Sequence, residues 1–190
     1  MVGAHSTDGR AAGYAHYTRW AILSVVVIGL LWTWISRPNT TSPTDAAAST
    51  RIGGTAPDFS LFTLQREKIS LQSLKGKVVV LNFWATWCPP CRAEMAALQA
   101  AQNNLKDKGL VVLGMNQLED PQLVEAFMQQ QHLTFQTALD MDGDAARLYR
   151  VQALPTTYFI DRKGVIRDVV LGGPMAQALI ESKVLALLDE

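Results

Sequence analysis

A β-branched and almost wholly apolar run, residues 77–85 (KVVVLNFWA), constrains the fold most strongly, because only a strand covered on both faces would bury it. A helical pattern follows at 89–106, and the same order recurs at 110–115 and from Asp120-Pro121 onward, where a capping acid precedes a first-turn proline. The other predicted elements are a hairpin of 59–64 and 67–71, a strand at 135–139, a short helix at 143–150, strands at 156–160 and 165–171, and a closing helix at 174–188. Alternating units of this kind predict an α/β domain whose parallel strands acquire an antiparallel edge.

The composition excludes several classes of protein. With 190 residues, the chain is long enough for one domain plus appendages but too short for a multidomain enzyme. Its 17 basic and 17 acidic side chains cancel, so no electrostatic footprint for nucleic acid follows. An apolar content of 48% argues against a disordered chain, and two cysteines are too few for a disulfide-stapled miniprotein. We therefore expect one folded domain that carries an additional segment.

The additional segment is an uncharged apolar run at 20–36 (WAILSVVVIGLLWTWIS), flanked by Arg19 and Arg37. A helix of that length reaches roughly 25 Å, slightly less than a bilayer core of roughly 30 Å, and aromatic residues at both ends extend its reach. We predict an uncleaved signal anchor that spans the plasma membrane once; a cleaved signal peptide and a buried core helix are the alternatives. The flanking charges do not fix its orientation. The expected domain boundaries are an N-terminal tail at 1–19, the transmembrane anchor at 20–36, a flexible tether at 37–57 and the folded domain at 58–190.

The two cysteines, Cys88 and Cys91, stand three positions apart where the buried strand passes into a helix start. The free amides and the dipole of a helix N-terminus lower the pKa of a thiol there, and Pro89 suits the first turn. Cys91 is within reach to form a disulfide and release a bound partner. A structural disulfide, half of a zinc site and idle thiols are the alternatives, but a bridge over two residues gains little entropy and zinc needs four ligands. The pattern favours a redox dithiol that needs no bound cofactor and no metal.

Two segments resemble thioredoxin-like proteins. Residues 82–91 (NFWATWCPPC) resemble the active-site strand and turn, and residues 153–161 (ALPTTYFID) resemble the segment in which that fold places a cis proline beside the cysteines. The resemblance implies that Pro155 is this proline and that it turns a backbone edge toward a substrate chain. Trp84 fits either the surface around the cysteines or the core. The substrate-contacting residues expected here are Trp87, Pro89, Leu154 and Thr156.

Within this superfamily, the chain resembles the TlpA and ResA type, which are membrane-tethered extracytoplasmic thiol-disulfide oxidoreductases. The similarity lies in residues 54–59 (GTAPDF), 91–94 (CRAE) and 120–139. It implies a thioredoxin-like fold with an N-terminal β-hairpin and an inserted αβ element, preceded by one transmembrane helix. Where ordinary thioredoxin keeps a buried acid, this chain has Asn82. The resemblance gives the proton-carrying role to Glu94, on the helix face of the second cysteine; alternatively, this acid only favours the first helical turn through the dipole.

Together these features predict a reductant of partner protein disulfides, in which Cys88 attacks and Cys91 releases the partner. The two prolines between the cysteines supply no basic side chain to stabilise the Cys88 thiolate, so the couple is expected to be reducing. The resemblance implies apocytochrome c as a client and a membrane protein as electron donor, on the extracytoplasmic side. A peroxiredoxin-type peroxidase and a non-catalytic module that binds copper or a partner protein are the alternative functions.

Overall fold

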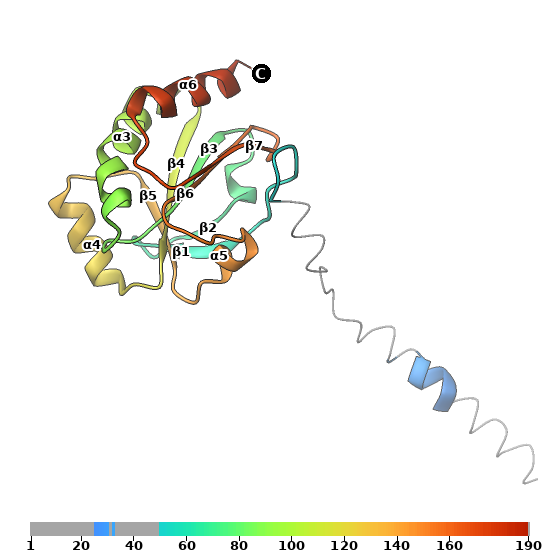
Figure 1. Cartoon of the computed structure of the whole chain (residues 1–190). Helices are drawn as coiled ribbons and strands as arrows, with labels where there is room; N and C mark the ends of the chain where they lie inside the picture. Colours follow the sequence, from blue (N-terminus) through green and yellow to red (C-terminus); the bar gives the residue numbers. More distant parts are fainter. Residues whose placement is uncertain (1–24, 31, 33–49, 190) are drawn as a thin grey trace, which may run out of the picture. The chain divides into compact units, whose positions relative to one another are not determined.

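The computed structural model describes residues 25–30, 32 and 50–189 (Figure 1). The chain divides into two compact units, residues 1–41 and residues 42–190. In the first unit, the described residues are helical and exposed. The rest of the predicted tail and anchor, and most of the predicted tether, lie outside the described residues. Within the described part of the chain, no helix is long and apolar enough to cross a membrane.

The second unit is built on a seven-stranded sheet with the order β2-β1-β5-β4-β3-β6-β7 (Figure 1). Its strands are β1 (Ser60–Thr63), β2 (Lys68–Ser70), β3 (Val78–Trp84), β4 (Leu110–Gln117), β5 (Gln136–Asp140), β6 (Thr156–Ile160) and β7 (Ile166–Leu171). β3, β4 and β5 are parallel, whereas β6 and β7 on one side, and β1 and β2 on the other, pair antiparallel with their neighbours. The predicted antiparallel edge is therefore present on both sides of the sheet.

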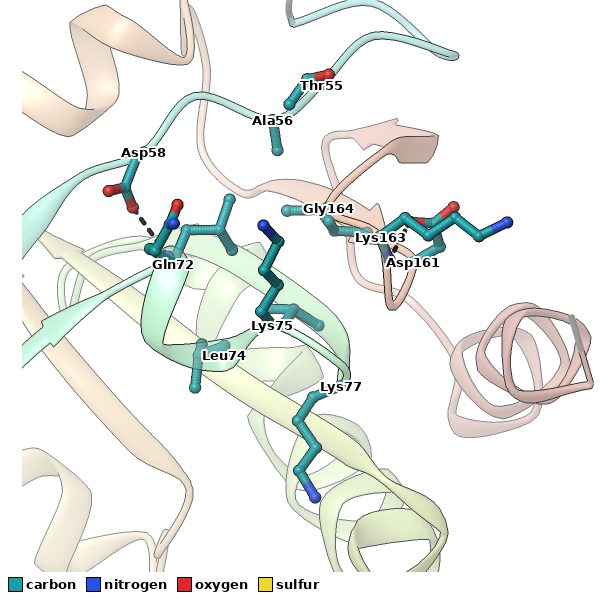
Figure 2. Close-up of a pocket in the computed structure, with 13 residues that line it drawn as sticks. Thr55, Ala56, Asp58, Gln72, Leu74, Lys75, Lys77, Asp161, Lys163 and Gly164 are labelled. Atoms are coloured by element: carbon teal, nitrogen blue, oxygen red, sulfur yellow. Dashed lines mark hydrogen bonds between the residues drawn. The ribbon is translucent and has the colours of Figure 1, made fainter.

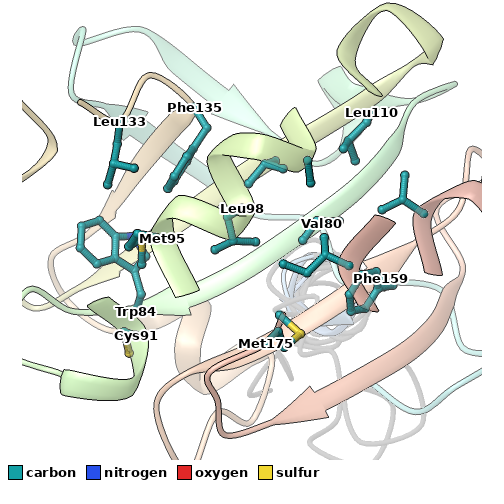
Figure 3. Packing of buried hydrophobic residues seen from close by; sticks show 14 of the residues in the cluster. Val80, Trp84, Cys91, Met95, Leu98, Leu110, Leu133, Phe135, Phe159 and Met175 are labelled. Carbon is teal, nitrogen blue, oxygen red and sulfur yellow. The ribbon is translucent and has the colours of Figure 1, made fainter. Parts of the chain in front are cut away.

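Helices cover both faces of this sheet. They are α3 (Pro89–Leu105), α4 (Pro121–Gln130), α5 (Asp144–Leu148) and α6 (Gln177–Leu188), with short 3₁₀ turns at Gln72–Leu74 and Lys106–Lys108. All seven residues of β3 are buried. Alternate β3 side chains, including Val80 and Trp84, pack with Met95 and Leu98 of α3 on one face (Figure 3). The intervening side chains, such as Phe83, pack on the other face with residues of α5 and the N-terminal hairpin. This two-sided cover explains why the β3 sequence is continuously apolar.

The parallel strands end together, which fixes where a site can form. Trp84 at the end of β3 is in register with Asn116 of β4, which is in register with Leu139 of β5. The loops after β3, β4 and β5 therefore leave the sheet at one edge, which we call the carboxyl edge. The opposite edge, where Val78 pairs with Leu110, is the amino edge. Ligands and catalytic groups in open α/β sheets gather at the carboxyl edge.

The predicted elements are present, and their boundaries differ most at the closing helix. That helix begins at Gln177 rather than at 174. The preceding loop contains a cis peptide bond between Gly173 and Pro174, and the Met175 amide donates to a side chain of α3 instead of entering a helix. A tight turn joins the strands predicted at 156–160 and 165–171, where Asp161 Oδ1 accepts hydrogen bonds from the amides of Lys163 and Val165.

Candidate active site

Cys88 and Cys91 lie at the carboxyl edge, in the turn that joins β3 to α3. Cys88 is the N-cap residue of α3, and Cys91 lies in its first turn. Their sulfurs are joined in a disulfide with an S–S distance of 2.08 Å and a Cα–Cα distance of 5.3 Å. Cys91 is fully buried and belongs to the core cluster, and Figure 3 shows it at the start of α3, whereas 3% of the Cys88 surface is exposed. Cys88 is thus the cysteine through which a partner can be reached.

The helix start places few polar groups on the Cys88 sulfur. The Cys91 amide donates to Cys88 Sγ at 3.3 Å, and the Arg92 amide donates to the Cys88 carbonyl at 3.1 Å. Pro89 and Pro90 carry no N–H, although they occupy the positions whose amides are free in other helices. The Cys88 sulfur therefore accepts from the helix backbone at its third residue rather than from a full turn of amides.

A groove of about 770 Å³ opens beside Cys88. Its lining residues come from the cysteine turn, the loop after β4, α5 and the loop before β6: Trp87, Cys88, Pro89, Pro90, Gln117, Leu118, Asp142, Gly143, Ala146, Arg147, Val151, Gln152, Ala153 and Leu154. Trp87 and Leu118 are each 67% exposed, so the groove presents apolar side chains to solvent. Three of the predicted substrate contacts, namely Trp87, Pro89 and Leu154, line it. Its size and lining suit an extended peptide.

The loop before β6 carries the predicted proline. The Leu154–Pro155 bond is cis, and the Pro155 carbonyl accepts a hydrogen bond from the Gly172 amide at 2.8 Å. Thr156, the fourth predicted contact, is buried, and its hydroxyl donates to the Ala153 carbonyl at 2.7 Å. The threonine hydroxyl therefore closes the loop from within, while Leu154 faces the groove.

Glu94 lies in the interior of the second turn of α3, fully buried. Its Oε1 accepts from Asn82 Nδ2 at 2.8 Å, and its Oε2 accepts from the Met175 amide at 3.0 Å. Asn82 also donates to Thr157 Oγ1 at 2.8 Å. Burial raises the pKa of the Glu94 carboxyl, and the hydrogen bonds from Met175 and Asn82 oppose that rise.

The position of Glu94 in α3 and its buried surroundings are compatible with proton transfer. The described first turn of α3 holds no acidic residue, so this carboxyl lies beyond the turn where the dipole favours an acid most. A buried carboxyl with a raised pKa exchanges protons closer to neutral pH than an exposed one. Asn82 stands where ordinary thioredoxin has a buried acid. Its amide cannot exchange a proton with the cysteines, and it donates a hydrogen bond to the Glu94 carboxyl instead.

Sequence reasoning missed Glu119, which follows β4 at the carboxyl edge. Its carboxylate accepts from the Thr86 amide at 2.7 Å, the Thr86 hydroxyl at 2.5 Å and Asn116 Nδ2 at 2.7 Å. It thereby holds the segment that leads into Cys88. The sequence feature that could have identified Glu119 is its position just after a parallel strand, where functional groups of open α/β sheets gather. Trp84, for which the sequence allowed either a surface or a core position, is fully buried, and its ring lies 5.4 Å from the Phe127 ring between centroids, tilted by 41°.

A buried disulfide at a helix start, beside a cis proline and an apolar groove, can exchange with the disulfide or dithiol of a partner chain. On this fold, the arrangement defines the class of thioredoxin-like thiol-disulfide oxidoreductases. Among the described residues, there is no group of three or more histidine, cysteine or acidic side chains placed to hold a metal.

Comparisons with known proteins agree with that class, and the chain belongs to the AhpC/TSA family, whose model matches residues 52–169. It is 49% identical over 123 residues to the thioredoxin-like protein YneN of Bacillus subtilis, a match covering 63% of this chain and 71% of that protein. It is 39% identical over 126 residues to the thiol-disulfide oxidoreductase ResA of Oceanobacillus iheyensis, covering 64% of this chain and 66% of that protein.

Solved structures with the same fold carry related descriptions. One is a crystal structure described as a thiol:disulfide interchange protein DsbE from Chlorobium tepidum, with 34% identity and a TM-score of 0.69, covering 73% of this chain and 98% of that chain. Another is a secreted Mycobacterium tuberculosis disulfide oxidoreductase described as homologous to E. coli DsbE, with 29% identity and a TM-score of 0.62, covering 68% of this chain and 96% of that chain. The chain is thus a thiol-disulfide oxidoreductase of the ResA and DsbE type.

Proposed function

We propose that the protein is a membrane-anchored, extracytoplasmic reductant of protein disulfides. The observation that carries the reducing direction is the helix start itself. Pro89 and Pro90 remove two amides that would stabilise a thiolate, and the Cys88 sulfur accepts from the Cys91 amide at 3.3 Å. A thiolate with less stabilisation makes the dithiol a better electron donor, because the reduced form gains less relative to the disulfide.

The reaction is a two-electron exchange in two steps. In the reduced protein, the Cys88 thiolate attacks one sulfur of a partner disulfide, forming a mixed disulfide and releasing the partner's other thiolate. Cys91 then loses its proton to Glu94, and its thiolate attacks Cys88 Sγ. The second partner thiolate leaves and takes up the proton that Glu94 received from Cys91, while the first takes up, through solvent, the proton that Cys88 lost on forming its thiolate. The partner therefore gains two electrons and two protons overall. The product is the Cys88–Cys91 disulfide seen in the structure.

The groove residues assign the substrate side of this reaction. Trp87, Pro89 and Leu154 line the groove next to Cys88 and are proposed to contact the partner chain. Pro155 turns the backbone before β6 toward the same groove, where an extended chain can pair with it. Thr156 acts indirectly, since its hydroxyl is committed to Ala153 and keeps that loop in place.

The apolar run at 20–36 and the similar proteins support a proposal for where the protein is located and which partners it has. We propose an anchor at 20–36, a tail at 1–19, a tether at 37–57 and the redox domain at 58–190, facing the extracytoplasmic side of the plasma membrane. The secreted description of the Mycobacterium tuberculosis relative supports that side. A client such as apocytochrome c, which presents closely spaced cysteines, and a membrane electron donor complete the proposed cycle.

A redox titration of the full chain in dithiothreitol or glutathione buffers tests the direction. A potential near that of thioredoxin, about −270 mV, is expected, whereas one near that of DsbA, about −120 mV, would contradict a reductant. The alternative functions separate in two further assays. Hydrogen peroxide consumption faster than that of free dithiothreitol would support a peroxidase. Stoichiometric copper(I) binding by the reduced protein, together with no reduction of insulin, would support a binding module.

A further inference from the structure

The amino edge of the domain, opposite the cysteines, gathers exposed basic side chains. The set, here called the basic edge, consists of Arg51, Lys75, Lys77, Lys106, Lys108, Arg162 and Lys163, and every member is exposed. Backbone hydrogen bonds bring their four segments together. The Val78 amide donates to the Gly109 carbonyl at 3.0 Å, and the Gly76 amide donates to the Arg162 carbonyl at 3.0 Å. Segments far apart in the sequence thus form one charged surface.

The chain enters the domain at this same edge. The Gly53 amide donates to the Ile166 carbonyl at 2.7 Å, and the Ala56 amide donates to the Gly164 carbonyl at 2.8 Å. Arg51 therefore lies next to the turn that carries Arg162 and Lys163. The first described residues of the domain connect the basic edge to the segment that precedes it in the sequence.

The positive charge of the basic edge is little compensated locally. Within the described part of the chain, Lys75, Lys77 and Lys163 form no ion pair. Two nearby acids are occupied, because Asp161 accepts from the Arg167 guanidinium at 2.7 Å and Asp58 accepts from the Gln72 amide at 3.0 Å. Exposed Asp107, between Lys106 and Lys108, offsets part of the charge, and the basic side chains still outnumber it.

Figure 2 shows how the basic side chains are arranged around a small hollow. The Lys75 side chain extends toward Ala56 and ends beside Gly164, while the ends of Lys77 and Lys163 point outward. The hollow has a volume of about 120 Å³ and includes the chain entry at Thr55. The hollow is smaller than the pockets that usually hold small-molecule ligands. The basic side chains around it project from a broad surface and do not converge on a closed site.

The carboxyl edge has the opposite character. Exposed acidic residues follow β4 and β5 there, namely Asp120, Asp142 and Asp144, of which Asp144 pairs with Arg147. Because the whole chain has a formal net charge of zero, the two edges represent a separation of charge and not an excess of one sign. A field of this kind orients the domain near a charged surface.

We propose that the basic edge docks on anionic phospholipid headgroups and holds the cysteine groove away from the bilayer. The inference rests on the proposed anchor, which would keep the domain within reach of the bilayer. Basic side chains near an anionic membrane each strengthen binding by about fivefold, and the effect fades within a Debye length of about 8 Å at physiological salt. Docked in this way, the carboxyl edge faces the compartment in which partner proteins are found.

Amine footprinting of the full chain in lipid vesicles tests the proposal. The protein is inserted into phosphatidylcholine vesicles with or without phosphatidylglycerol, and the acetylation rate of each lysine is measured by mass spectrometry. Lys68 is the internal control, because it is exposed and pairs with Phe62, which is in register with Leu139 near the carboxyl edge. We expect acetylation of Lys75, Lys77 and Lys163 to slow at least fivefold with phosphatidylglycerol, with Lys68 unchanged.

The competing outcomes are distinct. Equal acetylation rates on neutral and anionic vesicles would refute docking even if the chain floats with both. If the chain does not co-float with neutral vesicles in a density gradient, the proposed membrane anchor is refuted but the docking surface is not. In that case, binding of the chain to anionic vesicles would support docking, and no binding would refute it. Protection that appears only with an added acidic protein or nucleic acid would assign the basic edge to that partner instead.

A double variant sharpens the result. Lys75→Gln combined with Lys163→Gln should restore most of the acetylation of Lys77 on anionic vesicles, whereas the matched Lys68→Gln control should not. Raising the salt to about 0.5 M should mimic the double variant, because screening removes surface electrostatics. Insulin reduction in solution should be unchanged in both the double variant and the Lys68→Gln control. Protection of Lys77 that survives both the double substitution and high salt would contradict an electrostatic docking surface.

Discussion

Replacing Glu94 by glutamine should separate proton transfer from folding. The carboxylate accepts two hydrogen bonds, from Asn82 Nδ2 at 2.8 Å and from the Met175 amide at 3.0 Å. A glutamine keeps the acceptor for Met175 but turns an NH₂ group toward Asn82. Asn82 Oδ1 has no hydrogen-bond partner among the described residues, so rotation of its amide offers that oxygen to the new NH₂ group. The Thr157 hydroxyl can then donate to the same oxygen, and the variant should fold.

The stability of this variant should depend on pH in a defined direction. Burial raises the pKa of the Glu94 carboxyl in the folded protein above its ordinary value of 4.5, which applies to the unfolded chain. At a pH between the unfolded-state pKa and the folded-state pKa, the folded protein therefore binds more protons than the unfolded chain. The free energy of unfolding of the wild-type protein therefore falls as pH rises through that window. The Glu94→Gln variant lacks this dependence. Its stability relative to wild type should rise by about 1.4 kcal/mol for each pH unit by which the pKa is raised.

The Glu94→Gln variant should fold but transfer the Cys91 proton more slowly than wild type. General acid–base catalysis contributes about 10²- to 10⁴-fold, so release of a mixed disulfide by Cys91 should slow by about 10²-fold in Glu94→Gln at neutral pH. The rate should then increase with pH, because hydroxide must remove the proton of the Cys91 thiol.

Urea unfolding of the oxidised protein and stopped-flow release of a mixed disulfide, both followed from pH 4 to pH 9, measure the two effects. Glu67→Gln, on the exposed hairpin turn, is the control. An unchanged release rate with an unchanged pH profile would refute the proton-carrying role, and a stability difference that falls with pH would refute the burial argument.

Three further substitutions test the supporting structure. Gly173→Ala places a methyl group 2.6 Å from Glu94 Oε2, so it should cost about 1–3 kcal/mol of stability in urea unfolding; full stability would show that the loop yields freely. Glu119→Ala leaves two partly buried donors of Thr86 unpaired and should cost about 1–3 kcal/mol, with faster amide exchange at Thr86; unchanged exchange would contradict the anchoring contact. Leu98→Ala should cost about 2–5 kcal/mol without moving the redox potential, since its side chain is fully buried in the core; a shifted potential would link packing to the couple.

Most of the fold could be predicted from local sequence patterns. The apolar run of β3 is buried on both faces, and the acid and proline at 120–121 do open α4, with Asp120 as its N-cap. Such signals depend on neighbours within a few positions, which the sequence displays directly. The cis bond before Pro155 is present where the resemblance expected it.

Long-range contacts account for what the sequence did not reveal. Met175 holds Glu94 although it lies 81 positions later, and the cis bond at Pro174 delays the start of α6. Glu119 reaches Thr86 across 33 positions. Neither contact leaves a periodic or compositional trace, because each is set by which loops meet at the end of the folded sheet.

The central claim is that Cys88 attacks and Cys91 resolves, and trapping of the mixed disulfide tests it most directly. Reduced wild type and the Cys88→Ser and Cys91→Ser variants are each mixed with insulin, and the products are resolved by non-reducing electrophoresis and mass spectrometry. The account predicts insulin reduction by wild type, a stable insulin adduct through Cys88 in Cys91→Ser, and neither in Cys88→Ser. An adduct through Cys91 in Cys88→Ser, with no adduct in Cys91→Ser, would contradict it.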